Sequence, residues 1–130
     1  MKSLRGIKPK VTRDSEPLTK APPVPRHFDA FAREEWRRIM PRLIADGIVT
    51  RADLGGIEDL CVMRGLCRQI ETERAQNGGI IDKVQFGILN RAAQTARQLA
   101  AEYGLSPVSR ARIASNATPD DDDDNPLAVT

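Results

Sequence analysis

The residues that most often carry out catalysis are few in this chain. Histidine occurs once, as His27, so a Ser-His-Asp or Cys-His arrangement would depend on one residue next to a proline-rich segment. Cys61 and Cys67 lie six positions apart in a helical pattern, which points them to different sides of a helix. Two such cysteines supply neither a disulfide nor the four ligands of a zinc site, and we expect them to be reduced core residues.

Nucleotide and metal sites are equally poorly supported. Gly78-Gly79 lacks the preceding strand and the following lysine of a phosphate-binding loop, and is better explained as a helix stop. The run Asp120 to Asp124 lacks the spaced oxygens and the glycine turn of a calcium loop. The sequence therefore predicts a protein that is not an enzyme, has no metal or cofactor, and works by binding partners.

Basic side chains are the remaining candidates for function, and they suggest contact with nucleic acid. Lysines and arginines near the N-terminus would neutralise phosphates without reading sequence, although solubility alone is an alternative role. Another group flanks a predicted turn at 45–50, and a third follows Ser106-Pro107 at a predicted helix start, where amide hydrogens and guanidinium groups could hold an anion. For that third group an ordinary solvated helix end is the alternative. The DNA-binding candidates are Lys2, Arg5, Lys8, Lys10, Arg13, Arg37, Arg38, Arg42, Arg51, Arg110 and Arg112.

Charge is distributed unevenly along the chain. Residues 1–26 carry a net charge of +5, residues 27–105 a net charge of 0 and residues 106–130 a net charge of −3, which sum to +2. Basic arms and acidic tails usually address different partners. The candidates for a partner-binding tail are Asp120, Asp121, Asp122, Asp123 and Asp124.

Hydrophobic periodicity predicts the elements that must position these residues. Apolar residues at three- and four-residue spacing indicate helices over about 29–45 and, after a Thr50 cap, up to about residue 76. Residues 80–87 are expected to form a short extended or hairpin segment. A third helix is expected over about 89–102 and a short fourth over about 107–115, opened by Ser106 and Pro107.

The predicted fold is all-α, an antiparallel core of about four helices with disordered termini. Its parts are a flexible basic arm at 1–26, a helical oligomerisation core at 27–115 and an acidic disordered tail at 116–130. Alanine-rich and tryptophan-bearing helix faces are candidates for contacts between subunits, although Trp36 is foremost a core anchor. The interface candidates are Trp36, Ala93, Ala96 and Ala100.

Hydropathy predicts no membrane association. No stretch approaches the roughly 18 apolar residues of a membrane span, and the N-terminus lacks the apolar run of a signal peptide. We therefore expect a cytoplasmic protein.

The order of several motifs resembles a known family. The chain has Trp36-Arg37-Arg38-Ile39, then Pro41-Arg42-Leu43, the turn Asp46-Gly47-Ile48-Val49-Thr50, Asp53-Leu54 and Leu60-Cys61, and ends its core with Tyr103-Gly104-Leu105-Ser106-Pro107-x-Ser109-Arg110-x-Arg112. Over about residues 25–113 this resembles the small terminase subunits of tailed bacteriophages. The terminal motif is the most specific part, while Phe86-Gly87-Ile88-Leu89-Asn90 departs from the proline-marked start that often precedes the third helix in this family.

The resemblance implies a non-catalytic subunit of a DNA-packaging motor. Such a protein forms a cyclic homo-oligomer, recognises viral double-stranded DNA, and recruits or regulates the large subunit that holds the ATPase and nuclease, all in the host cell cytoplasm. Two other readings remain open: a helix-turn-helix transcriptional regulator that uses Thr50 and Arg51 to begin a recognition helix, and a structural adaptor without nucleic-acid binding.

Overall fold

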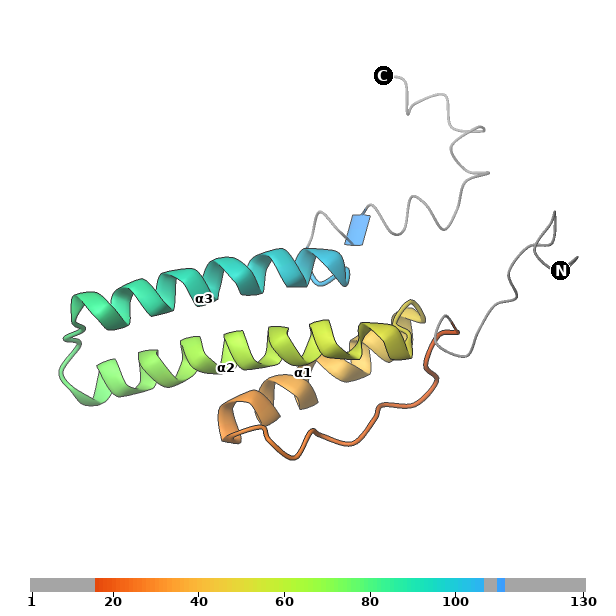
Figure 1. The fold of residues 1–130 in the computed structure, drawn as a ribbon, viewed down its shortest axis with the longest axis horizontal. Coiled ribbons are helices and arrows are strands. Elements are labelled where there is room, and N and C mark those ends of the chain that lie inside the picture. The colour runs from red at the N-terminus through yellow and green to blue at the C-terminus, as the bar shows by residue number, and fades with distance from the viewer. Residues whose placement is uncertain (1–15, 107–109, 112–130) are drawn as a thin grey trace, which may run out of the picture.

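The computed structural model describes residues 16–106 and 110–111. In this part of the chain three α-helices, α1 (Ala30–Asp46), α2 (Leu54–Gln76) and α3 (Lys83–Glu102), are accompanied by a short 3-10 helix, η3 (Arg51–Asp53), that leads into α2. Consecutive α-helices run in opposite directions (Figure 1), and the described residues contain no β-strand. The all-α, antiparallel prediction is therefore confirmed.

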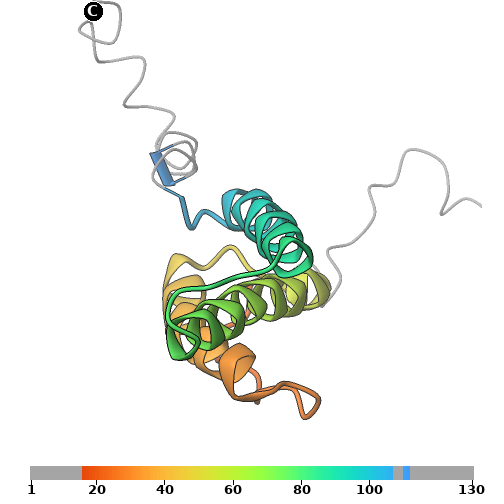
Figure 2. The ribbon, with the colours of Figure 1, turned by 90° about the vertical axis from the view of Figure 1, so that its left-hand side faces the viewer.

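The middle helix, α2, organises the fold because it packs against both of the others. Seen end-on, α1 and α3 lie on different sides of it (Figure 2). The core between the helices is apolar, and its largest fully buried side chains are Met40, Leu43, Val49, Ile57, Leu60 and Cys61. Burial of such side chains provides most of the driving force for folding.

Helix α1 lies within one residue of its predicted bounds at each end and buries the predicted face. Asp29 caps it, since its carboxylate accepts a hydrogen bond of 2.9 Å from the Ala32 amide. Trp36 and Leu43 lie on its buried face. Gly47 ends the helix in the left-handed conformation, with φ of 68°, which a residue without a Cβ adopts at no steric cost.

Two glycines of α2 allow its neighbours to come unusually close. A Cβ atom at Gly65 would lie 2.8 Å from the backbone nitrogen of Ala32 in α1, and one at Gly56 would collide with the Tyr103 side chain that follows α3. The α1–α2 crossing therefore depends on the absence of a side chain at Gly65, whereas Gly56 leaves room for the end of the Tyr103 ring. The start of α2 is also as predicted: the Asp53 carboxylate accepts a hydrogen bond of 2.8 Å from the Thr50 amide.

The segment at 80–87 differs from its prediction. Helix α3 begins at Lys83, so the expected extended or hairpin segment is wrong from that residue onward. The Asp82 carboxylate caps the helix by accepting a hydrogen bond of 2.7 Å from the Gln85 amide. The apolar residues here misled the pattern because Ile80, Val84 and Phe86 are exposed, so their spacing does not report a face packed against the core.

The predicted fourth helix falls largely outside the described residues. Arg110 and Ala111 are helical, and the Arg110 amide donates a hydrogen bond of 2.9 Å to the Ser106 carbonyl. The predicted acidic tail and residues 1–15 of the predicted arm also lie outside the described part of the chain.

The last residues of the predicted arm contact the core. This N-terminal strap, residues 16–28, runs beside the α1–α2 turn, where the Leu18 amide donates a hydrogen bond of 2.8 Å to the Val49 carbonyl. Leu18 and Val24 pack against the core cluster, and Phe28 is buried in it.

Candidate functional site

Four arginines from three parts of the chain surround one cavity of about 210 Å³. Arg38 and Arg42 come from α1, Arg64 comes from α2, and Arg110 follows α3. Apolar side chains complete the wall of this arginine cavity: Ile39, Leu60, Cys61, Ala100 and Leu105. Guanidinium groups above an apolar floor form a site suited to an anion with several oxygens.

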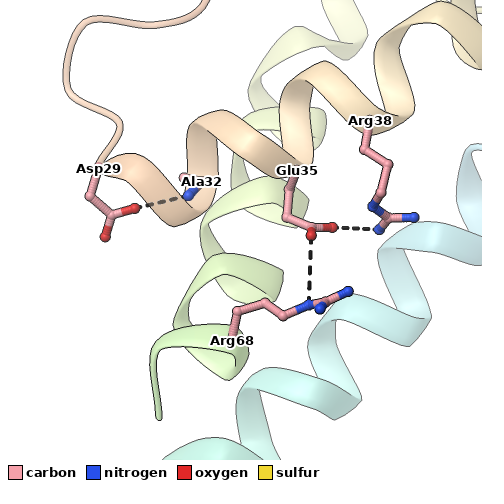
Figure 3. A network of polar contacts seen from close by, with 5 residues as sticks. All are labelled: Asp29, Ala32, Glu35, Arg38 and Arg68. Atoms are coloured by element: carbon pink, nitrogen blue, oxygen red, sulfur yellow. Dashed lines mark hydrogen bonds and ion pairs between the residues drawn. The ribbon is translucent and has the colours of Figure 1, made fainter. Parts of the chain in front are cut away.

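A buried carboxylate holds two arginines of this region in place. Glu35 is only 3% exposed, yet its two oxygens reach different helices: Arg38 of α1 donates to one, and the Arg68 Nε of α2 lies 3.8 Å from the other (Figure 3). Arg38 and Arg68 are themselves more than half exposed. Glu35 therefore fixes the inner edge of each guanidinium group while the outer edge faces solvent.

Positive charge exceeds negative charge around the cavity. Arg42 forms an ion pair with Asp46 at 3.1 Å, and Arg38 forms one with Glu35. Within residues 16–106 and 110–111, no carboxylate oxygen lies within 4.0 Å of the guanidinium nitrogens of Arg64 or Arg110. Four guanidinium groups thus face two paired carboxylates, which leaves donors for an external anion.

The basic surface continues into a groove between α2 and α3. Arg64 lines this groove as well as the cavity, and Arg68 and Arg97 follow it, with Glu71 as the acidic residue of its lining. The groove encloses about 740 Å³, and its apolar lining consists of Cys67, Leu89, Ala93 and Ala96. The cavity and the groove are together lined by six arginines, from the three helices and from the segment that follows α3.

Neither cysteine provides a nucleophile. Burial, followed by the charge of the nearby Glu35 carboxylate, raises the pKa of Cys61 to about 12. Burial, followed by the charge of Glu71, also raises the pKa of Cys67. Both thiols are free, as predicted, and both hold their protons at neutral pH.

The structure brings together part of the predicted DNA-binding set. Arg38, Arg42 and Arg110 meet at the arginine cavity, whereas Arg37 and Arg51 are exposed but do not line it. The candidates outside the described residues are Lys2, Arg5, Lys8, Lys10, Arg13 and Arg112.

Three arginines of the site were not predicted from the sequence: Arg64, Arg68 and Arg97. Arg64 and Arg68 are four positions apart and so share one face of α2. That spacing was the available signal, but it does not show that this face meets α1 on one side and Arg97 of α3 on the other.

The predicted interface residues lie mostly inside one chain. Trp36 is 3% exposed and stacks edge-on against Phe28, with ring centroids 5.7 Å apart. Ala96 and Ala100 are buried as well, and Ala93 is the half-exposed member of the set.

Large apolar side chains are exposed at the α2–α3 connection instead. Ile80 is 74% exposed, Val84 is 72% and Phe86 is 58%. We call these three residues the hairpin tip. Large exposed apolar side chains can mark a contact surface.

The α1–α2 pair differs from a helix-turn-helix motif in the length and burial of its second helix. The second helix of that motif crosses the first at about 90–120° and projects into the DNA groove. Here the 23-residue α2 runs back along α1 (Figure 1), and its buried face forms the centre of the core.

Two further properties concern the described residues alone. No group of three or more His, Cys, Asp or Glu side chains among them is arranged as metal ligands, and Asp120 to Asp124 fall outside this search. None of the described helices has the length and hydropathy to cross a membrane.

Comparison with known proteins gives one match. A family model described as "phage terminase, small subunit" matches residues 32–120, which include all three helices except the first residues of α1. No curated protein and no solved structure matches the chain.

Proposed function

Because the chain belongs to the family of phage terminase small subunits, which places it in phage DNA packaging, we propose that it is the DNA-binding, regulatory subunit of a packaging motor. In this proposal it binds viral double-stranded DNA, assembles with copies of itself into a ring, and recruits the large ATPase-nuclease subunit in the host cell cytoplasm. It carries out no catalytic step itself.

The arginine cavity is the observation that carries the DNA-binding part of this proposal. Arg64 and Arg110 have no carboxylate partner among the described residues, and Arg38 is held by Glu35 with its outer edge in solvent. Guanidinium groups in this arrangement suit the oxygens of backbone phosphates, which contribute affinity without reading sequence. The groove arginines would extend the contact to neighbouring phosphates, and the predicted arm residues would add to it.

Self-association is supported by the hairpin tip. Ile80, Val84 and Phe86 remain exposed in a single chain, and burying them against another copy would remove apolar surface from water. The acidic run Asp120 to Asp124 is a candidate for contact with a basic surface of the large subunit.

Duplex DNA binding at two salt concentrations tests the arginine cavity. The Arg38→Ala/Arg64→Ala variant should bind about tenfold or more weakly than the wild type near 50 mM salt, with a salt slope reduced by about one for each lost phosphate contact. The control is Arg91→Ala, which removes an exposed arginine of α3 that lines neither the cavity nor the groove. Equal affinity of the double variant and the wild type would contradict the DNA-binding site, and no binding by the wild type would favour a structural adaptor.

Light scattering tests self-association. The wild type should have a mass well above that of one chain, and Val84→Ser/Phe86→Ser should lower it. Ile48→Ser is the matched control, because Ile48 is also an exposed apolar residue, at 38%, but lies in the α1–α2 turn. A wild type that remains a monomer at every concentration would overturn the ring.

A further inference from the structure

We propose that the arginine cavity and the adjoining groove are also the docking site for the acidic run Asp120 to Asp124 of the same chain. The acidic run and DNA phosphates would then compete for the same guanidinium groups. The competition rests on the proposed function, whereas the docking of the run can be tested without DNA.

Charge complementarity is the first argument for this occupant. The run offers five consecutive carboxylates. The cavity offers four arginines, of which Arg64 and Arg110 have no carboxylate within 4.0 Å among the described residues. A carboxylate matches the two parallel donors of a guanidinium group, so aspartates of the run are suitable partners for the arginines that have no carboxylate. Arg110 also donates to the Leu105 carbonyl at 3.4 Å, which leaves its other donors for this contact.

The length of the connection is the second argument. Arg110 lines the cavity, and Asp120 follows it by ten residues. Ten residues span at most about 33–36 Å when fully extended, so Asp120 remains within that distance of the cavity wall. A connection of this length gives a local concentration of the acidic run in the millimolar range, to a first approximation.

The shape of the basic surface fits a linear occupant. Five extended residues measure about 17 Å, which is more than a cavity of about 210 Å³ accommodates. Arg64 lines both the cavity and the groove, so the run can continue past it to Arg68 and Arg97. The two hollows thus share Arg64 as a wall, and Arg110 of the cavity belongs to the same connection as the acidic run.

Docking would weaken DNA binding by direct competition. A competitor at a local concentration of about 1 mM with an intrinsic dissociation constant of about 0.1 mM lowers the apparent affinity for DNA about tenfold. The effect should diminish with added salt, because salt screens exposed charges. A partner that binds the acidic run would release the arginines for DNA.

Arginine modification tests the docking without DNA. The full chain and a variant with all five aspartates changed to asparagine are treated with phenylglyoxal, and the modified arginines are identified by mass spectrometry. Arg38, Arg64 and Arg110 should react several-fold faster in the variant, whereas Arg91 should react equally in both proteins. Equal rates at the cavity would overturn the proposal, as would protection confined to Arg5 and Arg13, or protection that disappears on dilution and so comes from a second copy.

A double-mutant cycle then separates competition at the cavity from a general effect of charge. Changing the five aspartates to asparagine should raise DNA affinity about tenfold in the wild-type background and much less in the Arg38→Ala/Arg64→Ala background. Equal gains in both backgrounds would mean that the tail acts through net charge alone, and would overturn the competition. Protection of the cavity arginines without any DNA binding would contradict the proposed function but not the docking. DNA binding through Arg38 and Arg64 without such protection would contradict the docking but not the proposed function.

Discussion

The two ends of the α2–α3 hairpin are built differently. At the end covered by α1, Ile57, Leu60 and Ala100 are at most 4% exposed, and the Tyr103 ring reaches Gly56. At the other end, Ile80, Val84 and Phe86 face solvent although they are as apolar as the core. One end has thus completed its packing within a single chain and the other has not, so stability depends on the covered end, and the tip is the candidate surface for the proposed association.

The largest expected effect compares one large apolar residue from each end. Ile57→Ala should lower the free energy of unfolding by about 2–5 kcal/mol, because it removes buried methyl groups and leaves a cavity. Phe86→Ala should change it by less than about 0.5 kcal/mol in dilute protein, where the tip is exposed. Urea denaturation measures both values, and a large loss for Phe86→Ala that grows with protein concentration would place the tip in an assembly.

A second comparison uses two glycines of the same helix. Gly65→Ala should destabilise the protein by about 1–3 kcal/mol, because its Cβ would lie 2.8 Å from the Ala32 nitrogen and α1 would have to move. Gly55→Ala has no heavy atom within 4 Å of its Cβ and should stabilise the helix by about 0.5–1 kcal/mol. Opposite signs in thermal unfolding support the close crossing, and a stabilising Gly65→Ala would refute it.

Two helix caps allow a comparison of α1 with the start of α3 at the hairpin tip. Asp29→Ala and Asp82→Ala each remove a side-chain acceptor from a helix start and should cost about 1 kcal/mol. At the tip this loss should appear mainly as faster hydrogen exchange of the amides at 85–86, since few packed side chains hold that turn. Unchanged exchange of these amides in Asp82→Ala would contradict the Asp82 cap and a helix that begins at Lys83.

The smallest effect at neutral pH concerns the Cys61 thiol. Its pKa is about 12 in the folded chain, against an ordinary value of 9.0, so the unfolded chain loses this proton first as the pH rises. The contribution to stability is complete below pH 9 and is lost between about pH 9 and 12. The difference in unfolding free energy between wild type and Cys61→Ala should therefore shrink across this interval, and a constant difference would place the thiol in contact with water.

Local chemistry made much of the fold predictable. Thr50 with Asp53, and Gly47, act on their own neighbours, so this cap and this stop follow from sequence. The Asp29 cap is equally local but was not predicted. The prediction at the tip was wrong because Ile80, Val84 and Phe86 break the usual relation between apolar character and burial. The arginine cavity could not be predicted for a different reason: Arg38, Arg64 and Arg110 are distant in sequence, and only the packing of α1 and α3 on α2 brings them together.

The N-terminal strap also has a consequence for the order of folding and for reach. The bond from Leu18 to Val49 joins distant parts of the chain, whereas the α2–α3 hairpin forms from neighbours, so the strap should dock last and open first. Opening would transfer residues 16–27 from the core surface to the basic segment before them, a gain of about 40 Å at full extension, while Phe28 stays in the core. The docking of Leu18 and Val24 would then determine how far the proposed DNA contacts, Lys2 to Arg13, can extend from the core.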